Sequence, residues 1–343
     1  MSRPIAADAS GPASPEDTVE LTYVEAVRWA LREALVSDPR VFLLGEDIGA
    51  RGGVFRVTDG LLAEFGPQRV IDTPIAESVI VGLALGAAAA GMRPVAEIQF
   101  ADYVHPAADQ LINEVAKLRY RSHGGWGCPL VVRMPYGAGV HGGPYHSQSV
   151  EALYFHVPGL KLVAPATPRD ARGLLLAAID DPDPVLFFEH KRLYRRVRGT
   201  LPRAPERLPL GRAAVVAPGD RATVVSYGAS VHEALRVAAA LQAEGIAIEV
   251  IDLRTLVPLD VETVLASVRK TSRVLVYHED TRRGGIGAEI AATIAEAAFE
   301  YLDAPPVRLA APDCHVPFAA PLEEAYLPLA PQLLAALRRL LAY

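Results

Sequence analysis

Glu77 stands at the start of a segment in which almost every other side chain is apolar. After Ser78, no polar residue occurs until Arg93. A helix that is apolar on all sides is buried on all sides, so we expect the Glu77 carboxyl to lie in the interior of the protein. A buried carboxyl pairs with a partner or holds a proton, which makes Glu77 a candidate for proton chemistry. The alternative is that Glu77 only stabilises the positive N-terminus of its helix.

His146 lies in a long, glycine-rich loop that spans residues 135–149. Long loops of this kind are usually functional or disordered. His146 is either a general acid or base or an exposed loop histidine. His141, in the same loop, does not form a metal site with it, because no third ligand is placed nearby.

Apolar runs alternate with helical patterns along the first half of the chain, and this predicts an α/β fold with a parallel sheet covered on both faces. The predicted strands are 41–44, 69–72, 94–99, 130–133, 160–164 and 185–188, and the predicted helices are 22–37, 77–91, 103–121, 151–156 and 169–180. Ligands of such sheets bind at the carboxyl ends of the strands. Glu46, Asp72, Gln99 and Tyr103 follow predicted strand ends, so we expect a site there.

The chain divides into a disordered tail (1–18), a first domain (19–194), a linker (195–211) and a smaller second α/β domain (212–343). The linker prediction rests on the region 192–212, which holds seven arginines and three prolines without periodicity. The second domain carries no candidate catalytic cluster. It is expected to support dimerisation or to offer a docking surface near its acidic pair, Glu323 and Glu324.

Composition excludes several classes of protein. A net charge of −6 argues against a general nucleic-acid binder. Two distant cysteines give no disulfide framework and fit a reducing compartment. The N-terminal segment has no signal-peptide core, and the apolar run after Glu77 is too short to span a bilayer. We therefore expect a cytoplasmic protein that binds no membrane.

Six motifs, taken together and in order, resemble the beta subunits of 2-oxo acid dehydrogenases, and within that family the branched-chain enzymes. They are residues 45–47, 72–77, 97–103, 116–122, 145–149 and 187–194. The resemblance runs from Leu21 to the C-terminus. It implies a transketolase-like, pyrimidine-binding first domain and a transketolase C-terminal-like second domain.

The resemblance also implies thiamine diphosphate as the cofactor. Glu77 matches a glutamate that hydrogen-bonds the pyrimidine ring, Tyr103 an aromatic that packs against it, and His146 a histidine that faces the reacting carbon. Glu46 resembles an acidic residue between two active sites, and Gln99 belongs to the same cofactor-binding set. The glutamate shifts the ring tautomer so that the exocyclic amine becomes the internal base, and the thiazolium serves as the electron sink for decarboxylation.

The Gly-Asp-Gly motif with which thiamine enzymes usually hold the diphosphate through magnesium is missing. The nearest match is Thr58-Asp59-Gly60, which follows no convincing strand. The resemblance therefore implies an alpha subunit that supplies the magnesium and diphosphate half of the site, in a heterotetramer with two of each chain. It further implies a 2-oxo acid substrate and a lipoyl-bearing acyltransferase core as partners.

A structural potassium site in relatives maps onto positions Cys128, Leu130, Val131, Ala178, Asp181 and Asp183. Val131 stands where relatives have a hydroxyl and Asp183 where they have an amide. His105 replaces a phenylalanine beside the substrate pocket. The competing readings are a pyruvate or acetoin dehydrogenase beta subunit, a single-chain transketolase-like enzyme, and a non-catalytic assembly subunit.

Overall fold

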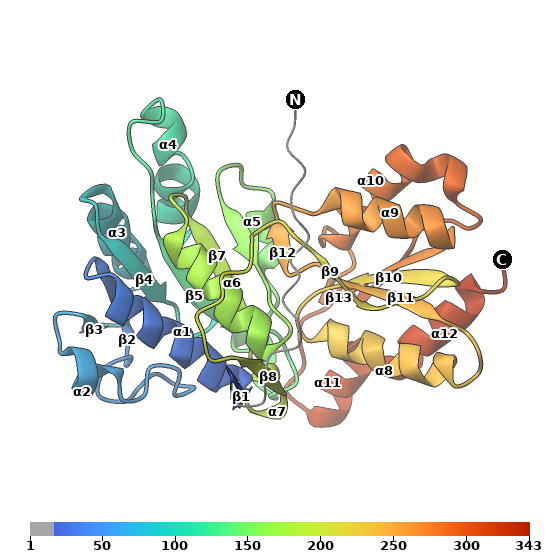
Figure 1. The fold of residues 1–343 in the computed structure, drawn as a ribbon, viewed down its shortest axis with the longest axis horizontal. Helices are drawn as coiled ribbons and strands as arrows, with labels where there is room; N and C mark the ends of the chain where they lie inside the picture. The colour runs from blue at the N-terminus through green and yellow to red at the C-terminus, as the bar shows by residue number, and fades with distance from the viewer. Residues whose placement is uncertain (1–16) are drawn as a thin grey trace.

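The protein contains two α/β units that lie side by side (Figure 1). The computed structural model describes residues 17–343. A seven-stranded sheet, in the order β12-β6-β7-β5-β4-β2-β3, forms the first unit, and a five-stranded sheet, β14-β13-β10-β11-β9, forms the second. A separate antiparallel pair joins β1 to β8.

Both main sheets are parallel, apart from one antiparallel edge strand in each, β12 and β9. The strands are β1 (Thr18–Thr22), β2 (Val41–Glu46), β3 (Val70–Thr73), β4 (Arg93–Glu97), β5 (Val131–Tyr136), β6 (Lys161–Val163), β7 (Val185–His190), β8 (Arg198–Pro202), β9 (Ala214–Ala217), β10 (Ala222–Ser226), β11 (Ile248–Asp252), β12 (Thr255–Val257), β13 (Val274–Thr281) and β14 (Val307–Ala311).

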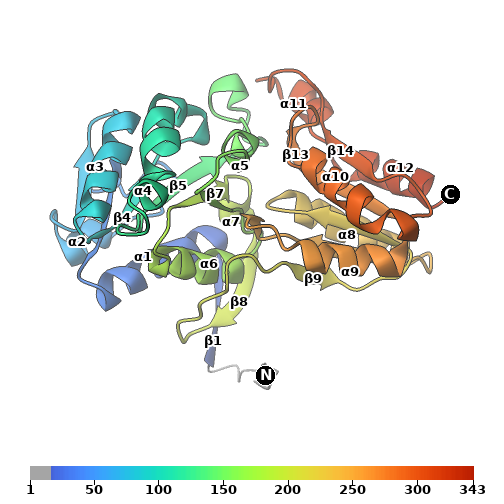
Figure 2. The same ribbon diagram turned by 90° about the horizontal axis from the view of Figure 1, so that it is seen from above.

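Helices cover both faces of each main sheet (Figure 2). They are α1 (Tyr23–Ser37), α2 (Leu61–Phe65), α3 (Glu77–Ala89), α4 (Leu118–Arg121), α5 (Glu151–Phe155), α6 (Pro168–Asp180), α7 (Leu193–Arg196), α8 (Ser230–Gln242), α9 (Val261–Thr271), α10 (Gly287–Ala298), α11 (Ala320–Tyr326) and α12 (Ala330–Leu340). In the first unit, α1 and α6 bury one face of the sheet, while α3 and the segment after β4 bury the other. None of these helices is long and apolar enough to cross a membrane.

The predicted fold class is confirmed, since continuous apolar strands do form parallel sheets that are buried on both faces. The capping box is also present. The Thr22 backbone N–H donates to Glu25 Oε2 at 2.7 Å, and the Glu25 N–H donates to Thr22 Oγ1 at 3.4 Å, which fixes the start of α1.

The predicted linker, 195–211, contains a short strand. This strand, β8, pairs along its whole length with β1. β1 itself begins at Thr18, inside the predicted tail; the rest of that prediction, apart from Asp17, lies outside the described residues. An extended, arginine-rich connection can thus also pair as an edge strand.

The helical stretch predicted over 103–121 is present, but it is not one regular α-helix. The segment forms 3₁₀ turns at Ala101–Tyr103 and His105–Ala107, then a π-helix over Gln110–Val115, before α4 begins. Pro106 lacks a backbone N–H and restricts the residue before it, which breaks a regular helix at this point.

The expectation that α3 is buried on all sides is also not met within this chain. Val79 and Leu83 are 52% and 57% exposed, and Ile75, just before the helix, is 75% exposed. Only one face of α3 packs on the sheet, through Ile80, Val81 and Ala84. One side of an apolar helix is thus left uncovered by the part of the chain that the structure describes.

Candidate functional site

Three polar residues converge where β2 and β4 end and α3 begins. Glu46 is the last residue of β2, Gln99 follows β4, and the two strands pair in parallel, so their carboxyl ends share one edge of the sheet. The Gln99 side-chain amide donates to the Glu46 carbonyl oxygen at 3.3 Å. Burial raises the pKa of Glu46, and the negative charges of Asp47 and Glu77 raise it further. The Glu46 and Glu77 carboxyls therefore lie within electrostatic reach of each other.

An aromatic group surrounds His146 at the same edge. The Tyr103 hydroxyl lies 3.4 Å from His146 Nε2. The Phe100 ring packs edge-on against the imidazole, with the ring centroids 4.6 Å apart. Phe100 and Tyr103 lie on the turn that follows Gln99. This turn therefore connects the cluster around Glu46 and Gln99 to the aromatic residues around His146. Tyr103 is 37% exposed, and His146 is half-buried.

The structure thus places all five predicted cofactor or catalytic residues at this edge: Glu46 ends β2, Gln99 and Tyr103 follow β4, Glu77 begins α3, and His146 lies in the loop after β5. Glu77 is half-buried at the first position of α3. Within residues 17–343 its carboxylate has no hydrogen-bonding side-chain or backbone partner. An unpaired carboxyl at the mouth of a site can accept or donate a proton to a bound molecule.

Residues that the sequence did not assign to the site hold the loop that carries His146. Asp102 Oδ1 accepts hydrogen bonds from the backbone N–H groups of Ser147 and Gln148, at 3.1 and 2.9 Å. Glu279 and Glu323, from the second unit, accept N–H groups from the other end of the loop. Glu323 is 1% exposed, so it is not part of a docking surface as was expected of the pair Glu323 and Glu324. Its sequence context, an acidic pair near the C-terminus, carried no signal of this role.

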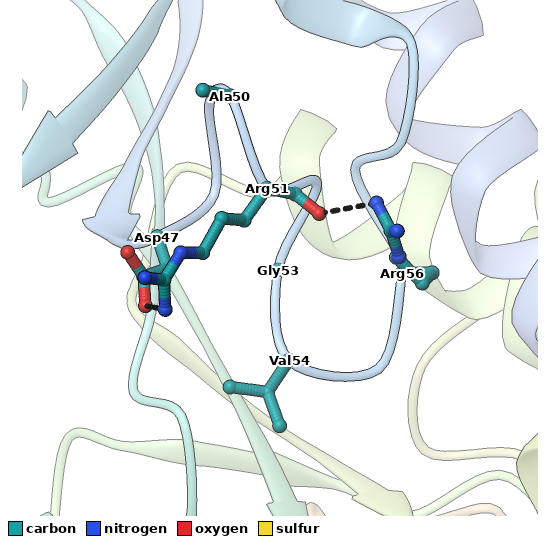
Figure 3. A pocket seen from close by; sticks show the side chains of 6 residues that line it. All are labelled: Asp47, Ala50, Arg51, Gly53, Val54 and Arg56. Atoms are coloured by element: carbon teal, nitrogen blue, oxygen red, sulfur yellow. Dashed lines mark hydrogen bonds and ion pairs between the residues drawn. The ribbon is translucent and has the colours of Figure 1, made fainter.

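A cavity of about 500 Å³ lies at the loop that follows β2 (Figure 3). The loop after β2 lines it through Asp47, Ala50, Arg51, Gly53, Val54 and Arg56. Arg51 pairs with Asp47 at 3.1 Å, and Arg56 donates to the Arg51 carbonyl oxygen at 2.7 Å. Neither Glu77 nor His146 lines this cavity, so it adjoins the predicted site without being that site.

The predicted potassium positions do lie together, but their charged groups already have cationic partners. Lys161 Nζ lies 2.6 Å from Asp181 Oδ2 and 3.9 Å from Asp183 Oδ2. Arg119 pairs with Asp183. Val131 offers no side-chain oxygen, and burial raises the pKa of the Cys128 thiol to about 12. Leu130 and Ala178 each use their carbonyl oxygen in a backbone hydrogen bond. Lys161 and Arg119 thus already neutralise the two aspartates, and the potassium site stays a prediction.

Comparison with known proteins decides the family. Residues 19–197 match the pyrimidine-binding domain of transketolase, and residues 211–333 match the transketolase C-terminal domain. The 2-oxoisovalerate dehydrogenase subunit beta of Bacillus subtilis (strain 168) is 52% identical over 322 residues, which cover 94% of this chain and 98% of the relative. This chain belongs to the family of 2-oxo acid dehydrogenase beta subunits. The resemblance seen in the sequence motifs is thereby confirmed.

Other relatives support the same assignment. A mitochondrial 2-oxoisovalerate dehydrogenase subunit beta of Arabidopsis thaliana is 48% identical, with 96% of this chain and 91% of the relative covered. The pyruvate dehydrogenase E1 component subunit beta of Bacillus subtilis is 45% identical, with 94% and 99% covered. Among solved structures, a split-gene transketolase described as an inactive beta4 tetramer superposes with a TM-score of 0.76 at 26% identity, and the match covers 94% of this chain and 98% of that one.

Proposed function

We propose that this chain is the beta subunit of a thiamine-diphosphate-dependent dehydrogenase of branched-chain 2-oxo acids. The full-length similarity to 2-oxoisovalerate dehydrogenase beta subunits supports the substrate class. The observation that carries the chemistry is the position of Glu77. Its carboxyl begins α3, lies within electrostatic reach of Glu46, and has no partner among the described residues.

The residues at the strand ends fit the pyrimidine half of the cofactor. Glu77 would exchange a proton with the ring, Tyr103 would pack against it, and Gln99 and Glu46 would line its approach. His146 would hold or move a proton at the reacting carbon of the substrate. Thiamine diphosphate supplies a thiazolium that accepts the electron pair released by decarboxylation.

A partner is required to complete this site. The chain contains no Gly-Asp-Gly motif for a magnesium-bound diphosphate, so an alpha subunit would hold magnesium and that end of the cofactor. The exposed apolar face of Ile75, Val79 and Leu83 adjoins Glu77 and supports such an assembly, because a contiguous apolar surface marks an interaction site. We infer a heterotetramer with two copies of each chain, which passes the acyl group to a lipoyl-bearing acyltransferase.

The test is Glu77→Gln in the enzyme assembled with its alpha subunit. The matched control is Glu289→Gln, because Glu289 is an exposed glutamate in the first turn of α10. If Glu77 only stabilises a helix N-terminus, both variants lose a few tenths of a kcal/mol of stability and keep turnover. If Glu77 exchanges a proton with the cofactor, only Glu77→Gln loses turnover, while its melting temperature stays close to that of the control.

The similarity to a pyruvate dehydrogenase beta subunit makes pyruvate the alternative substrate. Turnover of 3-methyl-2-oxobutanoate and of pyruvate by the same assembled enzyme separates the two. A higher kcat/KM for pyruvate would replace the branched-chain assignment. Full turnover by both Glu77→Gln and His146→Ala would instead favour a non-catalytic assembly subunit.

A further inference from the structure

The loop that carries His146 is fastened from the second unit by two buried glutamates. Glu279, on β13, accepts the Ala138 backbone N–H at 2.5 Å. Glu323, on α11, accepts the backbone N–H of Gly139 at 3.0 Å and that of His141 at 3.3 Å. Its second oxygen lies 2.6 Å from His141 Nδ1. These carboxylates lie 141 and 184 residues along the chain from the N–H groups of Ala138 and Gly139 that they bind.

The backbone of this loop needs such support. His141 has a left-handed φ of 59°, which is costly for a residue with a side chain. Gly139 and Gly143 also have positive φ, and a side chain at Gly143 would collide with the Phe318 ring that packs on it from the second unit. A conformation of this kind persists only where its surroundings hold it in place.

The other end of the loop is fastened within the first unit. Asp102 Oδ1 accepts the N–H groups of Ser147 and Gln148, and Ser147 Oγ accepts the Gly142 N–H at 3.1 Å. The loop is therefore held on the N-terminal side of His146 by glutamates of the second unit, and on its C-terminal side by Asp102 of the first unit. Three backbone N–H groups of the loop before His146 donate to side chains of the second unit. That unit supplies none of the proposed catalytic or cofactor-binding residues.

We propose that Glu323, together with Glu279, is a positioning residue that holds the His146 loop in its working conformation from the second unit. Hydrogen bonds from N–H groups to a carboxylate are about twice as strong as those between neutral groups. Glu323 has almost no access to water, so its loss would leave loop N–H groups without the acceptor around which they are arranged. This inference rests on the proposed role of His146.

The experiment uses the enzyme assembled with its alpha subunit and compares Glu323→Ala, Glu323→Gln and His141→Ala. The matched control is Glu324→Ala, because Glu324 is the exposed neighbour of Glu323 on the same helix. The first measurement is amide hydrogen exchange over residues 137–149. The second is kcat and KM for 3-methyl-2-oxobutanoate with an artificial electron acceptor, which reports the steps before acyl transfer.

Glu323→Ala is expected to speed exchange across the loop and to lower kcat by up to about a hundredfold, since a displacement of about 1 Å can cost that much. KM should change less, because the loop positions a reacting group. Glu323→Gln keeps an acceptor oxygen for Gly139 and His141 and should lose only a few-fold in kcat. His141→Ala keeps both backbone bonds and should resemble Glu323→Gln. If Glu323→Ala does not fold, these two milder variants decide the question by the same measurements.

Loop exchange in the Glu323 variants equal to that of Glu324→Ala would overturn the proposal, whatever the activity. Faster exchange with unchanged kcat would also overturn it, provided that His146→Ala, measured in parallel, does lower kcat. Unimpaired turnover by His146→Ala would mean that the proposed function of His146 has failed, and the exchange data alone would then decide whether the second unit holds the loop.

Discussion

Arg133 lies beneath the site in an ion-pair network that is fully buried. Its Nε and Nη2 donate to the two carboxylate oxygens of Glu189 at 2.6 and 2.7 Å, and its Nη1 donates to Glu97 at 2.6 Å. The Tyr194 hydroxyl donates to Glu189 at 2.6 Å. Glu97, Arg133 and Glu189 come from β4, β5 and β7, so the network joins adjacent strands. Glu97 ends β4, two residues before Gln99.

Arg133→Met should therefore be strongly destabilising. It leaves two carboxylates buried without a cation, and removing one partner of a buried pair costs about 3–5 kcal/mol. Burial raises the pKa of Glu97 even while Arg133 opposes that rise. Without Arg133 the folded-state pKa of Glu97 rises further above its unfolded value of about 4.3, so the native state must hold a proton.

The sign of the pH dependence follows from that shift. A raised folded-state pKa contributes stability that is present below the unfolded pKa and is lost as the pH rises through the folded value. Relative to the wild type, the variant should therefore lose further stability as the pH rises, so its destabilisation should be larger at pH 7 than at pH 5.

Urea unfolding followed by tryptophan fluorescence measures this, because both tryptophans, Trp29 and Trp126, lie in the first unit. Arg169→Met is the control. Arg169 makes a two-bond pair with Glu206, but its side chain is 53% exposed, so its loss should cost less than about 1 kcal/mol. Adding Glu97→Gln and Glu189→Gln to Arg133→Met should recover part of the loss. An Arg133→Met penalty no larger than that of the control, or one that does not change with pH, would refute the reasoning.

Four further outcomes are expected. His146→Ala should slow acylation of a lipoyl domain while thiamine diphosphate affinity, measured by calorimetry, changes less; loss of binding with normal chemistry would contradict its role. Burial, and then the charge of Asp170, raises the pKa of Asp252 to about 8, so stability from this group should fall as the pH rises from about 4 to 8. Asp252→Asn should remove that fall, and melting curves at pH 5 and pH 8 that respond as in the wild type would count against it. Replacing potassium with sodium at equal ionic strength should leave the melting temperature unchanged, because Lys161 pairs with Asp181. A clearly higher melting temperature in potassium than in sodium would instead support the metal site. If the C-terminal surface docks on the acyltransferase core, Glu324→Lys should lower core affinity in a salt-dependent way without changing activity, whereas unaltered affinity would exclude this surface.

Much of the fold could be predicted because it depends on local patterns. The continuously apolar run 185–188, for example, forms most of the buried central strand β7. The start of α1 follows from a capping box of four residues. The positions of Glu77 and His146 at one sheet edge follow from the rule that parallel strands share their carboxyl ends.

The features that sequence reasoning missed depend on contacts between distant parts of the chain. Whether α3 is buried on every side depends on a surface that residues 17–343 do not supply, as the exposure of Val79 and Leu83 indicates. From the sequence, Glu323 was expected to lie on the surface because it stands next to Glu324, which is indeed exposed. Only the fold brings the Glu323 carboxylate to N–H groups that are more than 180 residues away in the chain.

The two units are therefore less separable than their sequence boundaries suggest. β12 lies beyond the predicted linker, yet it pairs with β6 and completes the edge of the first sheet. Glu279 also binds His190, at the end of β7, with 2.9 Å between His190 Nε2 and Glu279 Oε2. A chain cut at residue 211 would lose this edge strand and both glutamate anchors of the His146 loop. Its loss of activity would then reflect a damaged site, so a docking function of the second unit has to be tested with single surface substitutions in the intact chain.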